Sequence, residues 1–175
     1  VNKENINKEE FKKLFEKLAK NLSTYKLSPF EQIICCALVF FDDKKVDLLI
    51  LEAGLGGRLD ATTAHNLRPI IAIGNIDLDH KEYLGNSIEE IAKEKVAVIE
   101  QNAFVISFRQ KASVEEIIQK RAKEVGAKIL WKESLSNDYE LGLKGDFQKQ
   151  NAAVAIGVIE ALNNIGFNIK ESSIK

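Results

Sequence analysis

What the sequence lacks excludes several classes of protein. No apolar run approaches the roughly 20 residues that a membrane-spanning helix needs, and no segment resembles a signal peptide. The formal net charge is -1, so there is no general electrostatic attraction to nucleic acid or to an anionic lipid surface. We therefore expect neither nucleic acid nor a membrane among the partners of this protein.

Cysteine is scarce and methionine is absent. The two cysteines, Cys35 and Cys36, are adjacent, and neighbouring cysteines rarely bridge each other and make no metal site alone. We interpret them as buried core thiols in a reducing compartment, for which the cytoplasm is the default. The chain begins directly with VNKENINKEEF and has no methionine at position 1. This start is typical of an internal piece of a longer protein, or of a processed chain.

What is present predicts an α/β fold in one domain, for which 175 residues supply a sizeable core. Short apolar runs alternate with helical patterns, which indicates a mostly parallel sheet with helices on both faces. We expect a well-buried helix to begin at Pro29, with Ser28 as its N-cap and Glu31 closing a capping box. The predicted strands are 46–52, 69–76, 103–107 and 128–131, and the other predicted helices are 11–22, 87–99, 113–125 and 148–165.

The stretch LEAGLGGRLDATTAHN, residues 51–66, follows the first predicted strand. In parallel sheets ligands bind beyond the carboxyl ends of the strands, here residues 52–60, 75–84 and the loop after Ser107. The stretch lacks the last glycine of a dinucleotide motif, and the P-loop pattern occurs nowhere in the chain. Glu52 would repel a bare phosphate, but it fits if a hard cation such as Mg²⁺ lies between them. A plain glycine-rich turn with Glu52 solvated is the alternative.

Asp77, Asp79 and His80 follow the second predicted strand, beside the first site if the two strands are neighbours. Three roles remain open for His80: a metal ligand, a general base, or a hydrogen-bonded surface histidine, of which the last is the commonest for a lone histidine.

Lys95 has an unusual place on the predicted helix 87–99. At about 100° per residue, the apolar side chains of this helix share one face, and Lys95 falls in the middle of it. A lysine there must extend its ammonium group to solvent, pair with an acid or lose its proton. An unprotonated amine is nucleophilic and can react with carbon dioxide, whereas a solvent-reaching lysine is the ordinary interpretation.

Three longer strings occur in order along the chain: LEAGLGGRLDAT, LDHKEYLGNSIEEIAKEK and GDFQKQNAAVA. Together they closely resemble the folylpolyglutamate synthase/dihydrofolate synthase family of the Mur ligase superfamily. The resemblance implies a Mur ligase central domain, similar to P-loop NTPases, and an ADP-forming carboxylate–amine ligase. Its small-molecule substrates would be ATP, glutamate and a folate or dihydropteroate, with Mg²⁺ as cofactor and the full-length enzyme a monomer.

The resemblance also implies roles for single residues. Glu52 matches a glutamate that binds Mg²⁺ near the nucleotide phosphates, His80 matches a histidine that holds a second Mg²⁺, and Lys95 matches a lysine that becomes a carbamate ligand of that metal. Gln148 and Asn151 match amides near the adenine of ATP. Arg58 and Asp60 match positions of the glycine-rich motif to which no individual role is assigned.

The family's N-terminal phosphate loop, approximately GTNGKGS, is not found in this chain. We therefore expect residues 1–175 to form part of the central ATP-binding domain of a longer ligase, incomplete at its N-terminus and inactive by itself. Two other hypotheses are a Mur-type ligase that adds an amino acid to another acceptor, and a short non-catalytic paralogue that binds a nucleotide or a partner.

Overall fold

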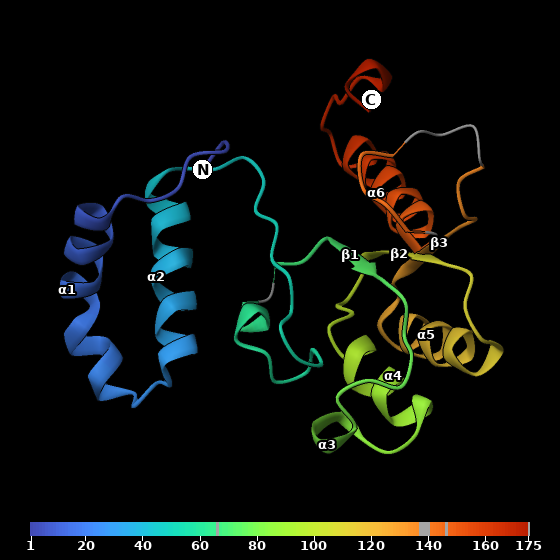
Figure 1. The fold of residues 1–175 in the computed structure, drawn as a ribbon, viewed down its shortest axis with the longest axis horizontal. Helices are drawn as coiled ribbons and strands as arrows, with labels where there is room; N and C mark the ends of the chain where they lie inside the picture. Colours follow the sequence, from blue (N-terminus) through green and yellow to red (C-terminus); the bar gives the residue numbers. More distant parts are fainter. Residues whose placement is uncertain (66, 137–140, 146, 175) are drawn as a thin grey trace. The chain divides into compact units, whose positions relative to one another are not determined.

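The structure is a computed structural model that describes residues 1–65, 67–136, 141–145 and 147–174. The chain divides into two compact units, Val1–Ala53 and Gly54–Lys175, which are described separately below. Figure 1 shows the first as a pair of blue helices and the second as a green-to-red assembly of helices and strands. No helix in the described ranges is long and apolar enough to cross a membrane. That residues 1–175 form one domain remains a prediction.

The first unit is built from the helices α1 (Lys8–Thr24) and α2 (Pro29–Asp43). The capping box of α2 is confirmed, because the Ser28 amide donates to the Glu31 carboxylate at 2.7 Å and the Glu31 amide donates to the Ser28 hydroxyl at 3.3 Å. Both bonds satisfy backbone groups that the first turn of a helix leaves without partners. The helices pack through a small cluster whose buried members are Leu14, Leu22 and Cys36.

The prediction that α2 is well buried is wrong within this unit. Phe30 and Ile33 are 49% and 53% exposed, and Cys36 is the one buried residue of the helix. A single neighbouring helix covers only one stripe of another, so a helix that is apolar on most sides keeps part of its surface open. Both cysteines are free thiols, and burial raises the pKa of Cys36, while Cys35 is only partly buried. The expectation of buried thiols therefore holds for Cys36 alone.

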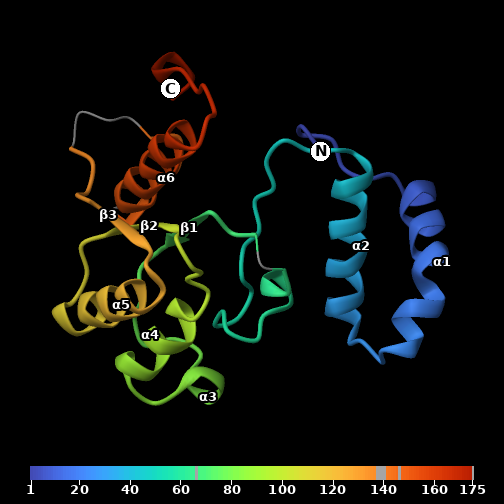
Figure 2. The same ribbon diagram turned by 180° about the vertical axis from the view of Figure 1, so that it is seen from behind.

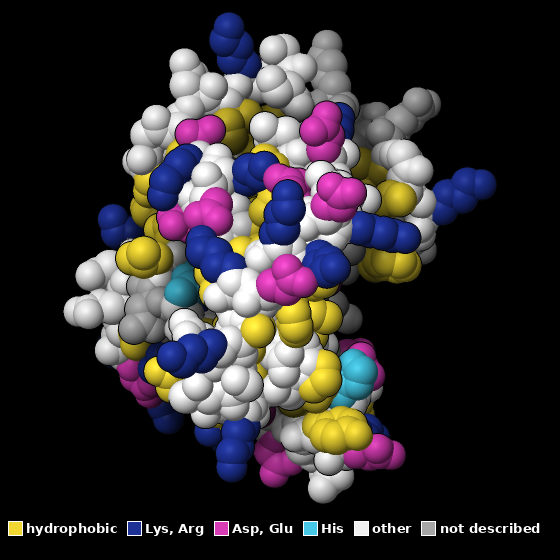
Figure 3. Space-filling view, turned by 90° about the vertical axis from the view of Figure 1, so that its left-hand side faces the viewer, with side chains coloured by type: hydrophobic (Ala, Val, Ile, Leu, Met, Phe, Trp, Pro, Cys, Tyr) yellow, Lys and Arg dark blue, Asp and Glu magenta, His cyan; other side chains and the backbone are white. Residues whose placement is uncertain are grey.

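Charges of both signs alternate on the exposed side of α1. Lys12 lies 3.9 Å from Glu16, and Lys17 lies 4.0 Å from Asp43 at the end of α2. In Figure 3, which views the molecule from the side of α1, basic and acidic side chains are intermixed rather than gathered by sign. Exposed pairs of this kind contribute little to stability, so they describe a solvated helix surface.

The prediction of a strand over residues 46–52 is wrong. The described residues of this segment form no helix or strand, and Leu48 and Ile50 are 45% and 84% exposed. A strand requires a neighbouring strand to pair its backbone N–H and C=O groups, and the sheet of the described residues contains only β1 (Ile70–Ile73), β2 (Phe104–Phe108) and β3 (Lys128–Lys132). An apolar sequence alone therefore does not make the segment a strand.

The second unit holds a parallel sheet with the strand order β1-β2-β3. Ile71 of β1 pairs with Val105 of β2, which pairs in turn with Ile129 of β3. Its elements in chain order are a 3-10 helix (Ala61–Thr63), β1 (Ile70–Ile73), α3 (Lys81–Leu84), α4 (Ile88–Val96), β2 (Phe104–Phe108), α5 (Ala112–Val125), β3 (Lys128–Lys132), α6 (Phe147–Asn164) and a second 3-10 helix (Glu171–Ser173).

Helices cover both faces of this sheet, as predicted. Figures 1 and 2 show α4 and α5 on one side and α6 on the other. The middle strand, β2, contacts the helices on both faces of the sheet. Val105 is fully buried in an apolar cluster with residues of α4 and α5, and Ile106 is fully buried in a second cluster with residues of α6. Gly157 lets α6 approach β2 closely, because a Cβ atom there would lie 2.7 Å from Ile106 Cγ2. The α/β fold class read from the sequence is therefore confirmed.

Candidate functional site

The carboxyl ends of β1 and β2 are joined by the side chain of Gln110, in the loop after β2. Its Oε1 accepts a hydrogen bond from the Ile76 amide at 2.9 Å, and its Nε2 donates to the Gly74 carbonyl at 3.1 Å and to the Ser107 hydroxyl at 2.9 Å. One amide side chain thus fixes the backbone of the loop that leads from β1 to His80. Sequence reasoning missed Gln110, because no local pattern marks a residue whose partners lie 34 and 36 positions earlier.

Asp77 lies on this loop and is anchored to the next one. Its Oδ1 accepts a hydrogen bond from the Leu78 amide at 2.9 Å and lies 3.1 Å from the Lys111 ammonium group. The Leu78 amide and then the Lys111 charge hold the pKa of the Asp77 carboxyl below its usual value. Asp77 is therefore an ionised, solvent-reaching carboxylate at the carboxyl edge of the sheet.

His80 lies beyond the same strand, at the position before the first residue of α3. Its backbone is in the left-handed region, with φ of 49°, and its amide donates to Asp79 Oδ1 at 2.8 Å. The imidazole Nε2 lies 3.5 Å from Asp79 Oδ2, and the side chain is 51% exposed. The three residues follow the carboxyl end of β1, as predicted, but the His80 imidazole approaches Asp79, whereas Asp77 is paired with Lys111. An imidazole so placed is open to a ligand.

Lys95 lies on α4, on the stripe that the sequence predicted. Ile91, Ala92 and Val96 are buried against the sheet, whereas Lys95 is only half-buried. Within the described part of the chain, its ammonium group makes no hydrogen bond or ion pair, so pairing with an acid is not observed. The helix ends at Val96 rather than at Ile99, although Ile99 stays fully buried.

The glycine-rich motif forms a loop that packs along α4. A Cβ atom at Gly57 would lie 2.5 Å from Val98 Cγ1 and 3.2 Å from the carbonyl oxygens of Glu94 and Lys95. Only glycine therefore fits at this position without displacing the end of α4. The Arg58 guanidinium adds an ion pair with Glu94, with Nε 3.1 Å from Oε1.

Asp60 organises this loop. Its Oδ2 accepts hydrogen bonds from the amides of Gly54 at 2.9 Å and Leu55 at 3.1 Å, while its Oδ1 accepts from the amide and the hydroxyl of Thr62 at 2.9 and 2.6 Å. Burial by itself would raise the pKa of Asp60, but the bonds from Thr62, Leu55 and Gly54 outweigh it and hold the pKa below its ordinary value. Asp60, a residue of the glycine-rich motif, therefore fixes the conformation of the loop through hydrogen bonds to residues 54, 55 and 62.

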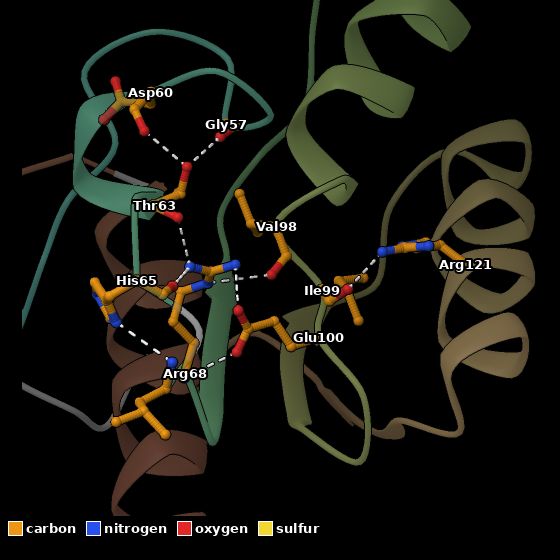
Figure 4. A network of polar contacts seen from close by, with 10 residues as sticks. Gly57, Asp60, Thr63, His65, Arg68, Val98, Ile99, Glu100 and Arg121 are labelled. Atoms are coloured by element: carbon orange, nitrogen blue, oxygen red, sulfur yellow. Dashed lines mark hydrogen bonds and ion pairs between the residues drawn. The ribbon is translucent and has the colours of Figure 1, made fainter.

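Arg68 ties the end of the same loop to the segment after α4, as Figure 4 shows. Its guanidinium donates to the carbonyl oxygens of Thr63 at 2.9 Å, of His65, and of Val98 at 3.4 Å, and it forms an ion pair with Glu100. Glu100 also accepts a hydrogen bond from the Arg68 amide at 3.0 Å. Residues 57–65 are therefore held against the connection that leads into β2.

Two amide side chains share one face of the first turn of α6. Asn151 donates to Gln148 Oε1 at 3.3 Å, and Gln148 is half-buried while Asn151 is exposed. Spacing of three residues along a helix places side chains side by side, and the structure brings this predicted pair together. Their role toward adenine stays a prediction.

Glu52 belongs to the first unit, where it is exposed and makes no hydrogen bond or ion pair with described residues. Across the described ranges, no three His, Cys, Asp or Glu side chains lie together as a metal centre. Magnesium, however, is usually bound by one or two carboxylates together with water and substrate phosphates. The exposed carboxylate of Glu52 fits that donor chemistry, and Lys95 would fit it only if it were converted to a carbamate.

No family model matches the chain. Known proteins do resemble it. A folylpolyglutamate synthase of Candida albicans is 31% identical over an alignment 204 residues long, which covers 100% of this chain and 40% of that protein. A dihydrofolate synthetase of Saccharomyces cerevisiae is 33% identical over 157 residues, which cover 78% of this chain and 36% of that protein. This chain belongs to the folylpolyglutamate synthase/dihydrofolate synthase family.

The fold agrees with this family. A solved Mycobacterium tuberculosis folylpolyglutamate synthase complexed with ADP superposes with a TM-score of 0.81 at 25% identity, over 94% of this chain and 44% of that one. The chain spans about two fifths of the length of the two curated relatives named above. Membership in the family confirms the resemblance found in the three sequence strings.

Proposed function

We propose that this chain is part of an ADP-forming ligase that joins glutamate to dihydropteroate or to a folate. The observation that carries the proposal is the match of the whole chain to a folylpolyglutamate synthase. In the proposed reaction ATP phosphorylates a carboxylate of the acceptor, the amine of glutamate attacks the acyl phosphate, and ADP and phosphate leave. The names of the relatives favour a pteridine acceptor over the acceptor of another Mur-type ligase.

ATP is the proposed nucleotide, and the ADP complex of the related synthase supports this choice. Gln148 and Asn151 are the proposed adenine contacts, because their amides lie side by side and carry both donors and acceptors. We also propose the cytoplasm as the location, which the two free cysteines support.

Lys95 and His80 are the proposed catalytic residues, and both are also proposed metal ligands together with Glu52. Lys95 is half-buried, lies on an otherwise apolar stripe and has no acidic partner within the described ranges, which supports its conversion to a carbamate. Carbamylation turns the cation into an anionic oxygen ligand. His80 would present its Nε2, and Glu52 its carboxylate. Bound Mg²⁺ would neutralise charge on the phosphoryl group that is transferred.

The residues around this site would hold the reacting groups in place. Gln110 fixes the loop that carries His80, and Asp77 is held ionised beside Lys111. Asp60 keeps the glycine-rich loop in one shape from residue 54 to residue 62. Fixed loops reduce the reorganisation that charge transfer requires, which is how a preorganised site lowers a barrier.

The test uses the protein encoded by the complete gene that contains this chain. It is given ATP, Mg²⁺, glutamate and either dihydropteroate or tetrahydrofolate, and ADP release is measured. We expect release that depends on glutamate and on at least one acceptor, and the preferred acceptor distinguishes the two activities of the family. Absence of ADP release with both acceptors would refute the substrate assignment.

The Lys95→Ala variant of that protein tests the carbamate. We expect turnover to fall by about a hundredfold or more, because a ligand that compensates phosphoryl charge is lost, and added formate or acetate to restore part of it. Lys123→Ala is the matched control, since Lys123 is an exposed lysine on α5. Near-normal turnover of Lys95→Ala, or equal losses in both variants, would leave Lys95 as a lysine that merely reaches solvent.

A further inference from the structure

A cleft of about 480 Å³ lies between α4 and α5, apart from the residues proposed for the ligase. Because β1, β2 and β3 are parallel, α4 and α5 both return from the carboxyl edge of the sheet to its amino edge. The cleft is formed near the C-terminal ends of these helices, so it faces away from the loop of His80. Its lining residues are Arg58, Lys93, Val96, Ala97, Ile117, Lys120, Arg121 and Glu124.

The cleft carries an excess of positive charge. Four of its lining side chains are cationic and one is acidic. Glu94 neutralises Arg58 from outside the lining, at 3.1 Å, and Glu124 approaches Arg121 only to 3.9 Å. Lys93 and Lys120 make no hydrogen bond or ion pair with any residue that the structure describes.

Arg121 is also incompletely satisfied. Its Nη2 donates to the Ile99 carbonyl at 2.9 Å, the contact seen at the right of Figure 4. Its Nε is buried and has no hydrogen-bond partner among the described residues. The side chain as a whole is 34% exposed, so an acceptor in the cleft would meet its exposed N–H groups rather than the buried Nε.

From these observations we propose that the cleft binds a short polyanion, a small molecule that bears two or more carboxylates or phosphates. The guanidinium groups of Arg58 and Arg121 suit carboxylates and phosphates, because the planar fork of an arginine can donate two parallel hydrogen bonds to either group. The cleft is open rather than enclosed, so charge and hydrogen bonds rather than enclosure would hold the ligand. The apolar lining residues Val96, Ala97 and Ile117 would contact the carbon atoms between the acidic groups of a carboxylate chain.

This inference does not depend on the proposed function, since none of the proposed catalytic residues, metal ligands or adenine contacts lines the cleft and the binding event involves no chemistry. Its test uses the 175-residue chain, with tri-γ-glutamate and tripolyphosphate titrated separately at low ionic strength. Binding is measured by calorimetry and by two-dimensional amide NMR spectra. We expect millimolar or tighter binding of at least one probe, with shifts confined to residues near Lys93, Ala97 and 117–124. The probe that binds more tightly shows whether the natural ligand carries carboxylates or phosphates.

The double variant Lys93→Gln/Lys120→Gln removes two exposed charges and should weaken binding about tenfold. Raising the salt concentration to about 0.3 M should weaken it further. Lys123→Gln is the matched control on the same helix, outside the lining, and should bind like the parent. Absence of binding by both probes, equal affinities for the double variant and the control, or shifts that map elsewhere would each overturn the proposal.

Discussion

Replacement of Asp60 by asparagine tests whether this carboxylate organises the glycine-rich loop. The native carboxylate accepts four hydrogen bonds, two at each oxygen, from Gly54, Leu55 and Thr62. Asparagine keeps the size but presents an NH₂ group to one pair of donors. Gly54 and Leu55 are exposed, so water replaces part of the hydrogen bonding that their amides lose. Toward Thr62 the carboxylate acts as the N-cap of the 3-10 helix. We expect a loss of about 1–2 kcal/mol in loop stability.

The pH dependence supplies a second test of the same residue. The pKa of Asp60 is lowered in the folded state, so the ionised form is favoured by folding. Its contribution is therefore fully present above the ordinary value of 3.8 and is lost as the pH falls through the lower, folded value. The difference between parent and Asp60→Asn should be largest near neutral pH and should shrink in acid.

Hydrogen exchange of the Gly54, Leu55 and Thr62 amides measures the local effect. A loss of about 1.4 kcal/mol corresponds to exchange about ten times faster. Urea unfolding followed by the fluorescence of Trp131, which lies on β3, reports the effect on the second unit. Glu116→Gln is the control, since Glu116 is an exposed carboxylate on α5. The reasoning is refuted if the three amides exchange as in the parent, or if the difference between the two proteins persists unchanged in acid.

Two further predictions concern packing and charge. Gly57→Ala should destabilise the second unit by about 1–3 kcal/mol in urea unfolding, because its Cβ would lie 2.5 Å from Val98 Cγ1. Gly142→Ala, whose Cβ would meet nothing within 4 Å, is the control, and equal effects would contradict the argument. Arg68→Ala should cost about 2–3 kcal/mol, since it leaves Glu100 largely buried without its partner. A double-mutant cycle with Glu100→Ala should show coupling above about 1 kcal/mol, against about 0.5 for the exposed pair Lys12–Glu16, and additivity would refute it.

Local signals were sufficient for much of the fold. The capping box at Ser28 is formed as the sequence predicted, because it joins residues three positions apart. The strands β1, β2 and β3 occur where short apolar runs predicted them, since a run of that length with helical patterns on either side is typical of a buried parallel strand. The apolar stripe of α4, with Lys95 on it, also follows from periodicity alone.

Segments 46–52 and α2 show where that reasoning fails. An apolar run predicts burial and pairing, but both need a partner surface, and the first unit supplies one helix face and no strand. The exposure of Ile50 and Ile33 therefore follows from what lies beside them rather than from their own sequence.

The sequence by itself determined the family, the order of β1, α4, β2, α5, β3 and α6, and the identity of the residues proposed for catalysis, because motifs and periodic patterns are short-range. Only the tertiary structure showed Gln110 joining two strand ends, Arg68 holding the glycine-rich loop beside Glu100, and the cationic cleft between α4 and α5. Gln110 contacts a residue 34 positions earlier and Arg68 one 32 positions later, while the residues of the cleft come from positions 58 to 124. Their partners are chosen by the packing of the sheet and its helices, which no short stretch of sequence encodes.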